Sequence, residues 1–141
     1  MDKKYKYKNS FSGRLAILCS DERFVKPTID FLNRSLGMTS CDFFILPGGP
    51  ESIASKKSEI LNPLKLLVDA HDIKEAILVS HEDCSYYKAL YKDSSPDLVY
   101  EKQGKDLVRA MDIIKGFRPG IKTTGYYCRI KDRGSVYFEK I

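Results

Sequence analysis

The sequence predicts an α/β protein whose sheet is mostly parallel and is covered by helices on both faces. Three short apolar runs, residues 14–20, 42–46 and 75–80, end abruptly in polar residues and are typical of buried strands. Segments with helical spacing of apolar residues follow them, and this alternation indicates parallel strands joined by helices. Residues 121–130 and 135–139 form two more predicted strands, joined by a turn as a hairpin.

Four helices are predicted between these strands. The first begins at Pro27, because proline suits the first turn of a helix, and it stops at Gly37. The start signal of the second is Asn62-Pro63, an N-cap followed by proline in the first turn. The expected helical ranges are 27–36, 64–70, 84–91 and 103–115.

The length of 141 residues suits one domain and is too short for two ordinary ones. We expect a basic N-terminal arm at residues 1–12 and a single domain at residues 13–141. Lysines interleaved with Tyr5 and Tyr7 in the arm form the one cluster of a kind that binds nucleic acid. The net charge of +5 is otherwise spread along the chain, so we expect a solvated arm and no nucleic-acid partner.

No apolar run is long enough to cross a bilayer, and the basic N-terminus lacks the apolar stretch of a secretory signal. We therefore expect a cytoplasmic protein with no membrane partner. Its four cysteines then need no disulfides, which favours metal or catalytic roles for some of them. Cys41 and Cys128 open or lie within predicted strands, and we expect them to be core thiols.

Two polar patterns follow predicted strands. Cys19 ends the first strand, and His81 and Cys84 follow the third. Ligands of parallel sheets collect at the carboxyl ends of the strands, and thiolate and imidazole are the ligands that zinc prefers. We expect Cys19, His81 and Cys84 to bind one zinc ion and to leave a fourth position open, as in a catalytic site. The alternative is two buried structural cysteines and a surface histidine.

Asp21 and Arg23 lie two residues apart on the loop that leaves the first predicted strand. We expect them to form a charge-assisted pair. Beside a zinc ion, an aspartate held in this way accepts a hydrogen bond from zinc-bound hydroxide and orients it toward a substrate. The alternative is a surface ion pair that contributes little.

The chain resembles the beta-class carbonic anhydrases in its most distinctive motifs. The family signature is Cys-x-Asp-x-Arg after the first strand and His-x-x-Cys after the third, and residues 19–23 and 81–84 match it. Residues 125–137 are similar to the family's final pair of strands, and the resemblance covers residues 14–138. It implies four parallel strands with a fifth, antiparallel strand at the edge.

The resemblance also implies an activity, which is the reversible hydration of carbon dioxide to bicarbonate. One zinc ion would be held by Cys19, His81 and Cys84, with Asp21 and Arg23 as the orienting dyad. Zinc lowers the pKa of bound water to about 7, which gives a hydroxide nucleophile at neutral pH. The family pairs its subunits, so the resemblance further implies a homodimer.

Three features depart from the family pattern. Only the short arm precedes the first strand, the loop at 47–51 does not read Arg-Asn-Ala-Gly-Asn, and Ser85 replaces a glycine. Two other functions stay open: a related hydrolase of carbonyl sulfide or carbon disulfide, and a zinc-binding regulatory protein without catalysis. The intact Asp21–Arg23 dyad opposes the second, because a purely structural zinc site does not need it.

Three further residues are candidates for proton transfer. His71 carries an imidazole, which suits that role near neutral pH, but it precedes the third strand and is expected on the surface opposite His81. Glu82 and Asp83 are nearer to the expected metal and are either proton relays or part of a solvated loop.

Overall fold

The computed structural model describes residues 2–141 and contains one mixed, five-stranded sheet. The strands are β1 (Arg14–Cys19), β2 (Asp42–Leu46), β3 (Glu75–His81), β4 (Lys122–Asp132) and β5 (Ser135–Lys140). Their order in the sheet is β2-β1-β3-β4-β5, with four parallel strands and β5 antiparallel to β4 at the edge. The predicted fold class is confirmed.

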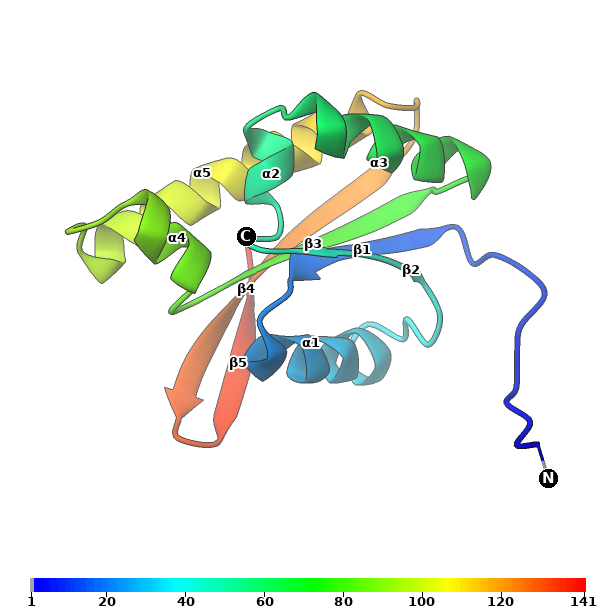
Figure 1. Cartoon of the computed structure of the whole chain (residues 1–141), viewed down its shortest axis with the longest axis horizontal. Coiled ribbons are helices and arrows are strands. Elements are labelled where there is room, and N and C mark those ends of the chain that lie inside the picture. Colours follow the sequence, from blue (N-terminus) through cyan, green and yellow to red (C-terminus); the bar gives the residue numbers. More distant parts are fainter. Residues whose placement is uncertain (1) are drawn as a thin grey trace.

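Helices cover both faces of the sheet, as predicted (Figure 1). They are α1 (Glu22–Arg34), α2 (Glu51–Ala54), α3 (Ser58–Ala70), α4 (Ser85–Leu90) and α5 (Pro96–Lys115). α1 packs on one face, and α2, α3 and α5 pack on the other. α4 is joined to α5 by a hydrogen bond from the Tyr87 hydroxyl to Asp106, at 2.7 Å.

The strands β1 and β3 are buried on both faces of the sheet, which explains their nearly continuous apolar sequences. Leu15 and Ile17 of β1 face the core beneath α2, α3 and α5, whereas Ala16 and Leu18 face the core beneath α1. A shift of one residue would exchange these two sets, so the packing fixes the register of β1 against β3. The register in turn sets where the carboxyl ends of both strands lie.

Three helices begin earlier than the sequence analysis predicted, and those predicted starts are wrong. α1 begins directly after Asp21, whose side chain accepts a hydrogen bond from a backbone N–H of the first turn, so Pro27 lies inside the helix. Pro63 likewise lies inside α3. α5 begins at Pro96 rather than at residue 103, because Ser95 caps its first turn. The four-residue α2 was not predicted.

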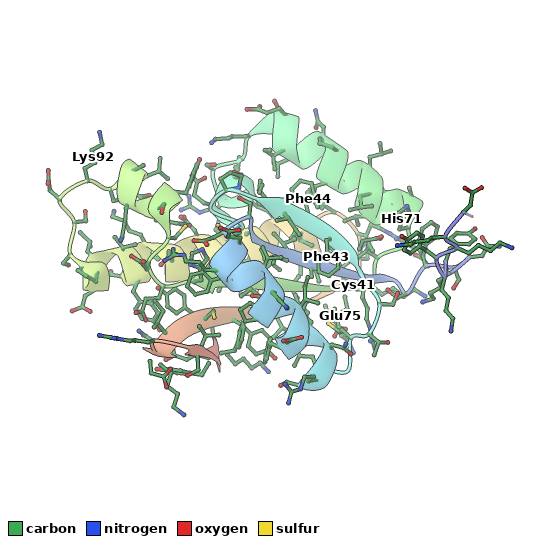
Figure 2. The ribbon with its side chains drawn as sticks, turned by 60° about the horizontal axis from the view of Figure 1, so that its bottom comes forward. Cys41, Phe43, Phe44, His71, Glu75 and Lys92 are labelled. Atoms are coloured by element: carbon green, nitrogen blue, oxygen red, sulfur yellow. The ribbon has the colours of Figure 1, made fainter. Side chains whose placement is uncertain are left out.

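The N-terminal arm extends away from the sheet (Figure 1). Residues 2–13 carry no helix or strand, Tyr5 and Tyr7 are each 83% exposed, and Met1 lies outside the described residues. The arm contacts the fold at Phe11, whose ring stacks on His71 with a centroid separation of 3.8 Å. His71 also bonds Asp42, the first residue of β2, at 2.6 Å, which places it at the amino ends of the strands (Figure 2).

None of the helices among residues 2–141 has the length and apolar character that a membrane crossing requires.

Candidate metal centre

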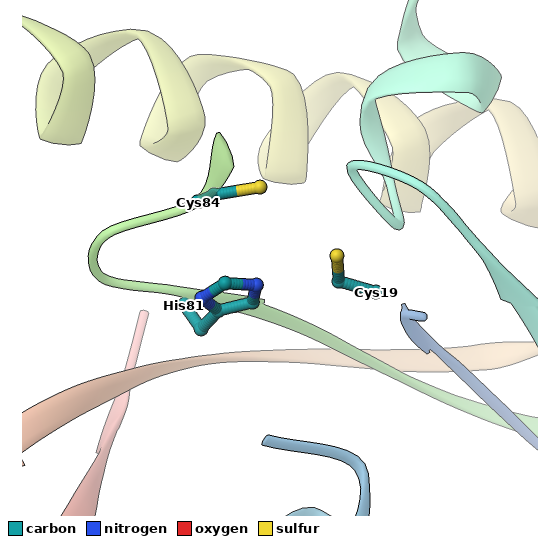
Figure 3. Close-up of side chains that lie close together, drawn as sticks. All are labelled: Cys19, His81 and Cys84. Carbon is teal, nitrogen blue, oxygen red and sulfur yellow. The ribbon is translucent and has the colours of Figure 1, made fainter. Parts of the chain in front are cut away.

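Cys19, His81 and Cys84, which we call the ligand cluster, meet at the carboxyl end of the sheet (Figure 3). Cys19 is the last residue of β1 and His81 is the last residue of the neighbouring β3. The strand order reverses between these two strands, and ligands of parallel sheets bind at such a reversal. Cys84 is the N-cap residue of α4, at the end of the turn that follows β3.

The spacing of the ligand cluster suits a small metal ion. The two Sγ atoms and the imidazole nitrogen lie within 4.8 Å of one another, and all three side chains are buried. Two sulfurs bound to tetrahedral zinc at about 2.3 Å stand about 3.8 Å apart, so little adjustment is needed. Figure 3 shows both sulfurs and the edge of the imidazole turned toward one common space.

The surroundings of His81 fix its ring and leave one nitrogen free. Nδ1 lies 2.7 Å from the backbone oxygen of Glu82, which only accepts hydrogen bonds, so Nδ1 carries the proton. Nε2 then presents a lone pair, and it is buried with no hydrogen-bond partner among the described residues. The ring also stacks on Phe24 at a centroid separation of 3.9 Å. A histidine held in this way is arranged as a metal ligand.

The carbonyl group of His81 has a side-chain partner that the sequence analysis missed. Gln103 donates from Nε2 to this oxygen at 2.9 Å, and its Oε1 accepts a hydrogen bond from the Tyr127 hydroxyl at 2.9 Å. Gln103 lies on the buried face of α5, one turn before Leu107, and is 1% exposed. The sequence does contain a signal for this contact. Gln103 lies on the same face of its helix as the core residues Leu107 and Ile114, and a buried amide needs polar partners.

The proximity of Cys19 and Cys84 moves the pKa values of the two thiols in opposite directions. The thiol of Cys84 donates to the Cys19 sulfur, and this bond is the main reason why the pKa of Cys19 is lowered to about 4. Burial opposes that shift, whereas hydrogen bonds from the backbone N–H groups of Asp21 and Gly48 support it. The same bond to Cys19, together with burial, raises the pKa of Cys84. The lowered pKa favours the thiolate form of Cys19, which is the form that binds zinc.

Asp21, Arg23, Asp83 and Lys88 form a charged rim beside the ligand cluster. Arg23 donates to Asp21 at 2.7 Å and to Asp83 at 3.0 Å, and Lys88 pairs with the other oxygen of Asp83. The hydrogen bond from Arg23 lowers the pKa of Asp21, and Lys88, ahead of Arg23, lowers the pKa of Asp83. The predicted dyad is therefore formed, with Asp21 bound to Arg23 and outside the group of close ligand atoms.

The loop after β2 lies close to α4 at Gly48 and close to the end of β1 at Gly49. Gly48 and Gly49 both have positive φ, at 79° and 57°. A Cβ atom on Gly49 would lie 2.9 Å from the backbone nitrogen of Cys19, and one on Gly48 would lie 2.5 Å from the ring of Tyr86. Only glycine allows this approach, which brings the Gly48 N–H to the Cys19 sulfur.

A cavity of about 470 Å³ opens in front of the ligand cluster. Its walls include Cys19, Asp21, Arg23, Pro47, Cys84 and Tyr86. Glu82 lies outside it, with its carboxylate 3.9 Å from Arg129. A larger groove of about 1110 Å³ between α1 and the β4–β5 hairpin includes no member of the ligand cluster. The smaller cavity therefore gives a small molecule access to Cys19, Cys84 and Asp21.

The fold and the site together define an α/β protein with a mostly parallel sheet and a candidate metal site. Its Cys, His and Cys side chains lie where the strand order reverses. A family model described as "Putative carbonic anhydrase" matches residues 8–137, and the chain belongs to this family. An uncharacterised protein of Rickettsia bellii is 31% identical over 120 residues, which cover 79% of this chain and 73% of that one.

Solved structures share the fold at low sequence identity. A beta-carbonic anhydrase of Trichomonas vaginalis matches with a TM-score of 0.59 at 15% identity, over 96% of this chain and 87% of that chain. A carbonic anhydrase of Streptococcus mutans matches with a TM-score of 0.58 at 15% identity, over 97% and 87%. A carbon disulfide hydrolase matches with a TM-score of 0.53 at 17% identity, over 89% and 77%.

Proposed function

We propose that the chain catalyses the zinc-dependent, reversible hydration of carbon dioxide to bicarbonate. The observation that carries this proposal is the buried Nε2 of His81, which has no hydrogen-bond partner within residues 2–141 and is turned toward the sulfurs of Cys19 and Cys84. A buried nitrogen without a partner costs free energy, and a metal ion would remove that cost. Membership of the carbonic anhydrase family supports this activity.

The residues of the site would have two different roles, metal binding and orientation. Cys19, His81 and Cys84 would hold one zinc ion, which when bound acts as a Lewis acid and makes a coordinated water more acidic. Asp21 accepts hydrogen bonds only, because its lowered pKa keeps the carboxylate ionised at neutral pH. Arg23 holds that carboxylate at 2.7 Å and so fixes the direction of its free lone pairs at the cavity mouth.

Metal analysis combined with a stopped-flow hydration assay tests the proposal. We expect about one zinc per chain in protein purified without added metal, with X-ray absorption reporting two sulfur ligands and one nitrogen ligand. Hydration of carbon dioxide should be faster than in buffer and should stop when the metal is removed. An intact protein without zinc, or a zinc-loaded protein without turnover, contradicts the activity.

Hydrolysis of carbon disulfide or carbonyl sulfide is a second candidate. The structural similarity to a carbon disulfide hydrolase favours it, and those linear molecules would use the same ligand cluster. Hydrogen sulfide release from either substrate, measured beside hydration on the same zinc-loaded sample, separates the two activities. A zinc-loaded protein inactive in both assays supports the third alternative, a zinc-binding regulatory protein.

We also propose that the chain forms a homodimer in the cytoplasm. β2 and β5 are the edges of the sheet, and an unpaired edge is a common site of pairing between copies. The four free cysteines suit a reducing compartment. Sedimentation velocity at micromolar concentration tests the assembly, and a monomer there contradicts it.

A further inference from the structure

We propose that Gln103 is a positioning residue of the metal centre. In this role its side-chain amide fixes the backbone at His81 and thereby aims Nε2 at the sulfurs of Cys19 and Cys84. The inference rests on the proposed function only for the identity of the metal. The arrangement of His81 itself is a property of the metal-free chain.

His81 pairs with Cys128 of β4, but on the side of β1 its carbonyl group lies beyond the pairing of β3. The pairing of β3 with β1 ends at Leu18 and Val79, two residues before His81. On the other side, the N–H of Glu82 donates to the backbone oxygen of Cys128 at 2.9 Å. The peptide group between His81 and Glu82 is therefore held by β4 through its N–H. Gln103 holds the carbonyl end of the same peptide group, at 2.9 Å.

The orientation of this peptide group controls the imidazole ring. Both ends of the group are hydrogen-bonded, so Glu82 has a fixed place at the start of the turn. The backbone oxygen of Glu82 receives the proton of His81 Nδ1 at 2.7 Å. That hydrogen bond selects the tautomer with a lone pair on Nε2, the nitrogen that faces the two sulfurs. Without Gln103, the peptide group can rotate and the tautomer is no longer fixed.

Gln103 is itself held in one orientation. A carbonyl oxygen only accepts, so the amide nitrogen of Gln103 must face His81 and its oxygen must face Tyr127. The ring of Tyr127 packs edge-on against Tyr100 at 4.7 Å, and the Arg129 guanidinium lies 5.3 Å from its centroid. A buried polar chain with its partners satisfied is rigid. An apolar residue would fill the same place on α5 and leave the His81 oxygen without a partner.

The test compares Gln103→Met with Leu107→Ala. Methionine keeps the length of the side chain and removes both hydrogen bonds, whereas Leu107→Ala disturbs the packing of α5 one turn away and leaves the polar chain intact. We expect Gln103→Met to weaken zinc binding by about 10- to 100-fold in competition with a chelator, as the loss of a residue that orients a metal ligand does elsewhere. Leu107→Ala should lower the urea midpoint of unfolding and leave the zinc dissociation constant unchanged.

Nitrogen-15 NMR of the metal-free proteins gives a readout that is independent of zinc. We expect His81 to be a single Nδ1–H tautomer in the wild type and in Leu107→Ala, and a mixture of tautomers in Gln103→Met. Equal zinc affinity and a single tautomer in Gln103→Met overturn the role of Gln103. A wild type that binds no zinc overturns the proposed function instead, while the tautomer still decides the role of Gln103.

Tyr127→Phe keeps the inference testable if Gln103→Met does not fold. The substitution removes only the hydroxyl that donates to Gln103. We expect a smaller increase in the zinc dissociation constant and a partial loss of the single tautomer. No change in either measurement also overturns the role of Gln103.

Discussion

The ligand cluster and the charged rim lie beside each other at one end of the sheet, but different forces hold them in place. The ligand cluster is buried and is fixed by strand ends, by backbone hydrogen bonds and by the stacking of Phe24 on His81. The charged rim is partly solvated, with the side chain of Arg23 51% exposed and that of Lys88 62% exposed. Its members are held by ion pairs instead.

This difference separates metal binding from turnover. Buried hydrogen bonds and packing are insensitive to salt, whereas exposed ion pairs are screened and contribute little to stability. Substitutions in the ligand cluster should therefore change metal content, and substitutions in the charged rim should change the hydration rate with the metal in place.

The largest effect is expected for Cys84→Ser. A serine hydroxyl does not ionise at neutral pH, so the substitution removes one of the two sulfur ligands. We expect the zinc content to fall well below one per chain after dialysis against a chelator, as measured by mass spectrometry of the metal. Cys41→Ser is the matched control, because Cys41 is a free cysteine outside the ligand cluster. Zinc retained in Cys84→Ser, or lost equally in Cys41→Ser, contradicts the assignment.

The next effect is expected for Asp21→Asn, in the charged rim. The amide keeps the size of the side chain but replaces one acceptor oxygen with a donor. We expect zinc and fold to be retained while hydration of carbon dioxide slows by about 10²- to 10³-fold, as for the loss of other positioned groups. A stopped-flow assay with parallel metal analysis measures both quantities.

Arg23→Ala serves as the companion variant to Asp21→Asn. It frees the Asp21 carboxylate from its partner, so that this carboxylate competes for the metal at any pH. We expect loss of activity from pH 6.5 to 9 with zinc retained. If wild type, Asp21→Asn and Arg23→Ala all show the uncatalysed rate throughout this range, the protein is not a carbonic anhydrase.

The sequence predicted the ligand cluster because its members are tied to strand ends. A buried strand is recognised in the sequence as an apolar run. The first polar or ligating residue at the end of the run marks the carboxyl end of the strand. The sequence therefore predicts that Cys19 and His81 lie at the carboxyl ends of the parallel strands. The structure brings them together with Cys84. Their role as zinc ligands stays a prediction that the metal analysis tests.

Other features depend on contacts that no local pattern contains. Gln103 meets His81 only because α5 packs across the carboxyl half of β3, and the two residues are 22 positions apart in the sequence. The helix starts were missed for a different reason. Proline favours the first turn of a helix, but Pro27 and Pro63 both lie inside helices that begin several residues earlier. For α1, the Asp21 side chain that caps the helix is also a member of the charged rim.

Gly49→Ala tests how tightly the loop after β2 is bound to the ligand cluster. The new Cβ atom would lie 2.9 Å from the backbone nitrogen of Cys19, at a φ of 57°. Gly37→Ala is the control, because its φ is 67° and, apart from its chain neighbours, no atom of residues 2–141 lies within 4 Å of the new Cβ. We expect Gly37→Ala to cost about 1 kcal/mol of unfolding free energy from backbone strain alone, and Gly49→Ala to cost clearly more. Urea unfolding measures the difference, and equal costs would mean that the loop moves away freely.

The smallest effect is expected for Lys88→Met, which removes one cation from the charged rim. Its partner Asp83 has a lowered pKa, so the pair contributes stability above the unfolded carboxyl pKa of about 3.9 and loses it as pH falls further. Because the pair is exposed, we expect Lys88→Met to lower the unfolding free energy at pH 7 by less than about 1 kcal/mol. The difference from wild type should vanish in about 1 M salt, where the screening length is about 3 Å. Zinc affinity should not change, since the Lys88 ammonium pairs with Asp83, which is not a member of the ligand cluster. A weaker zinc affinity in Lys88→Met would show that the charged rim also holds the ligand cluster, and the separation between the two regions would fail.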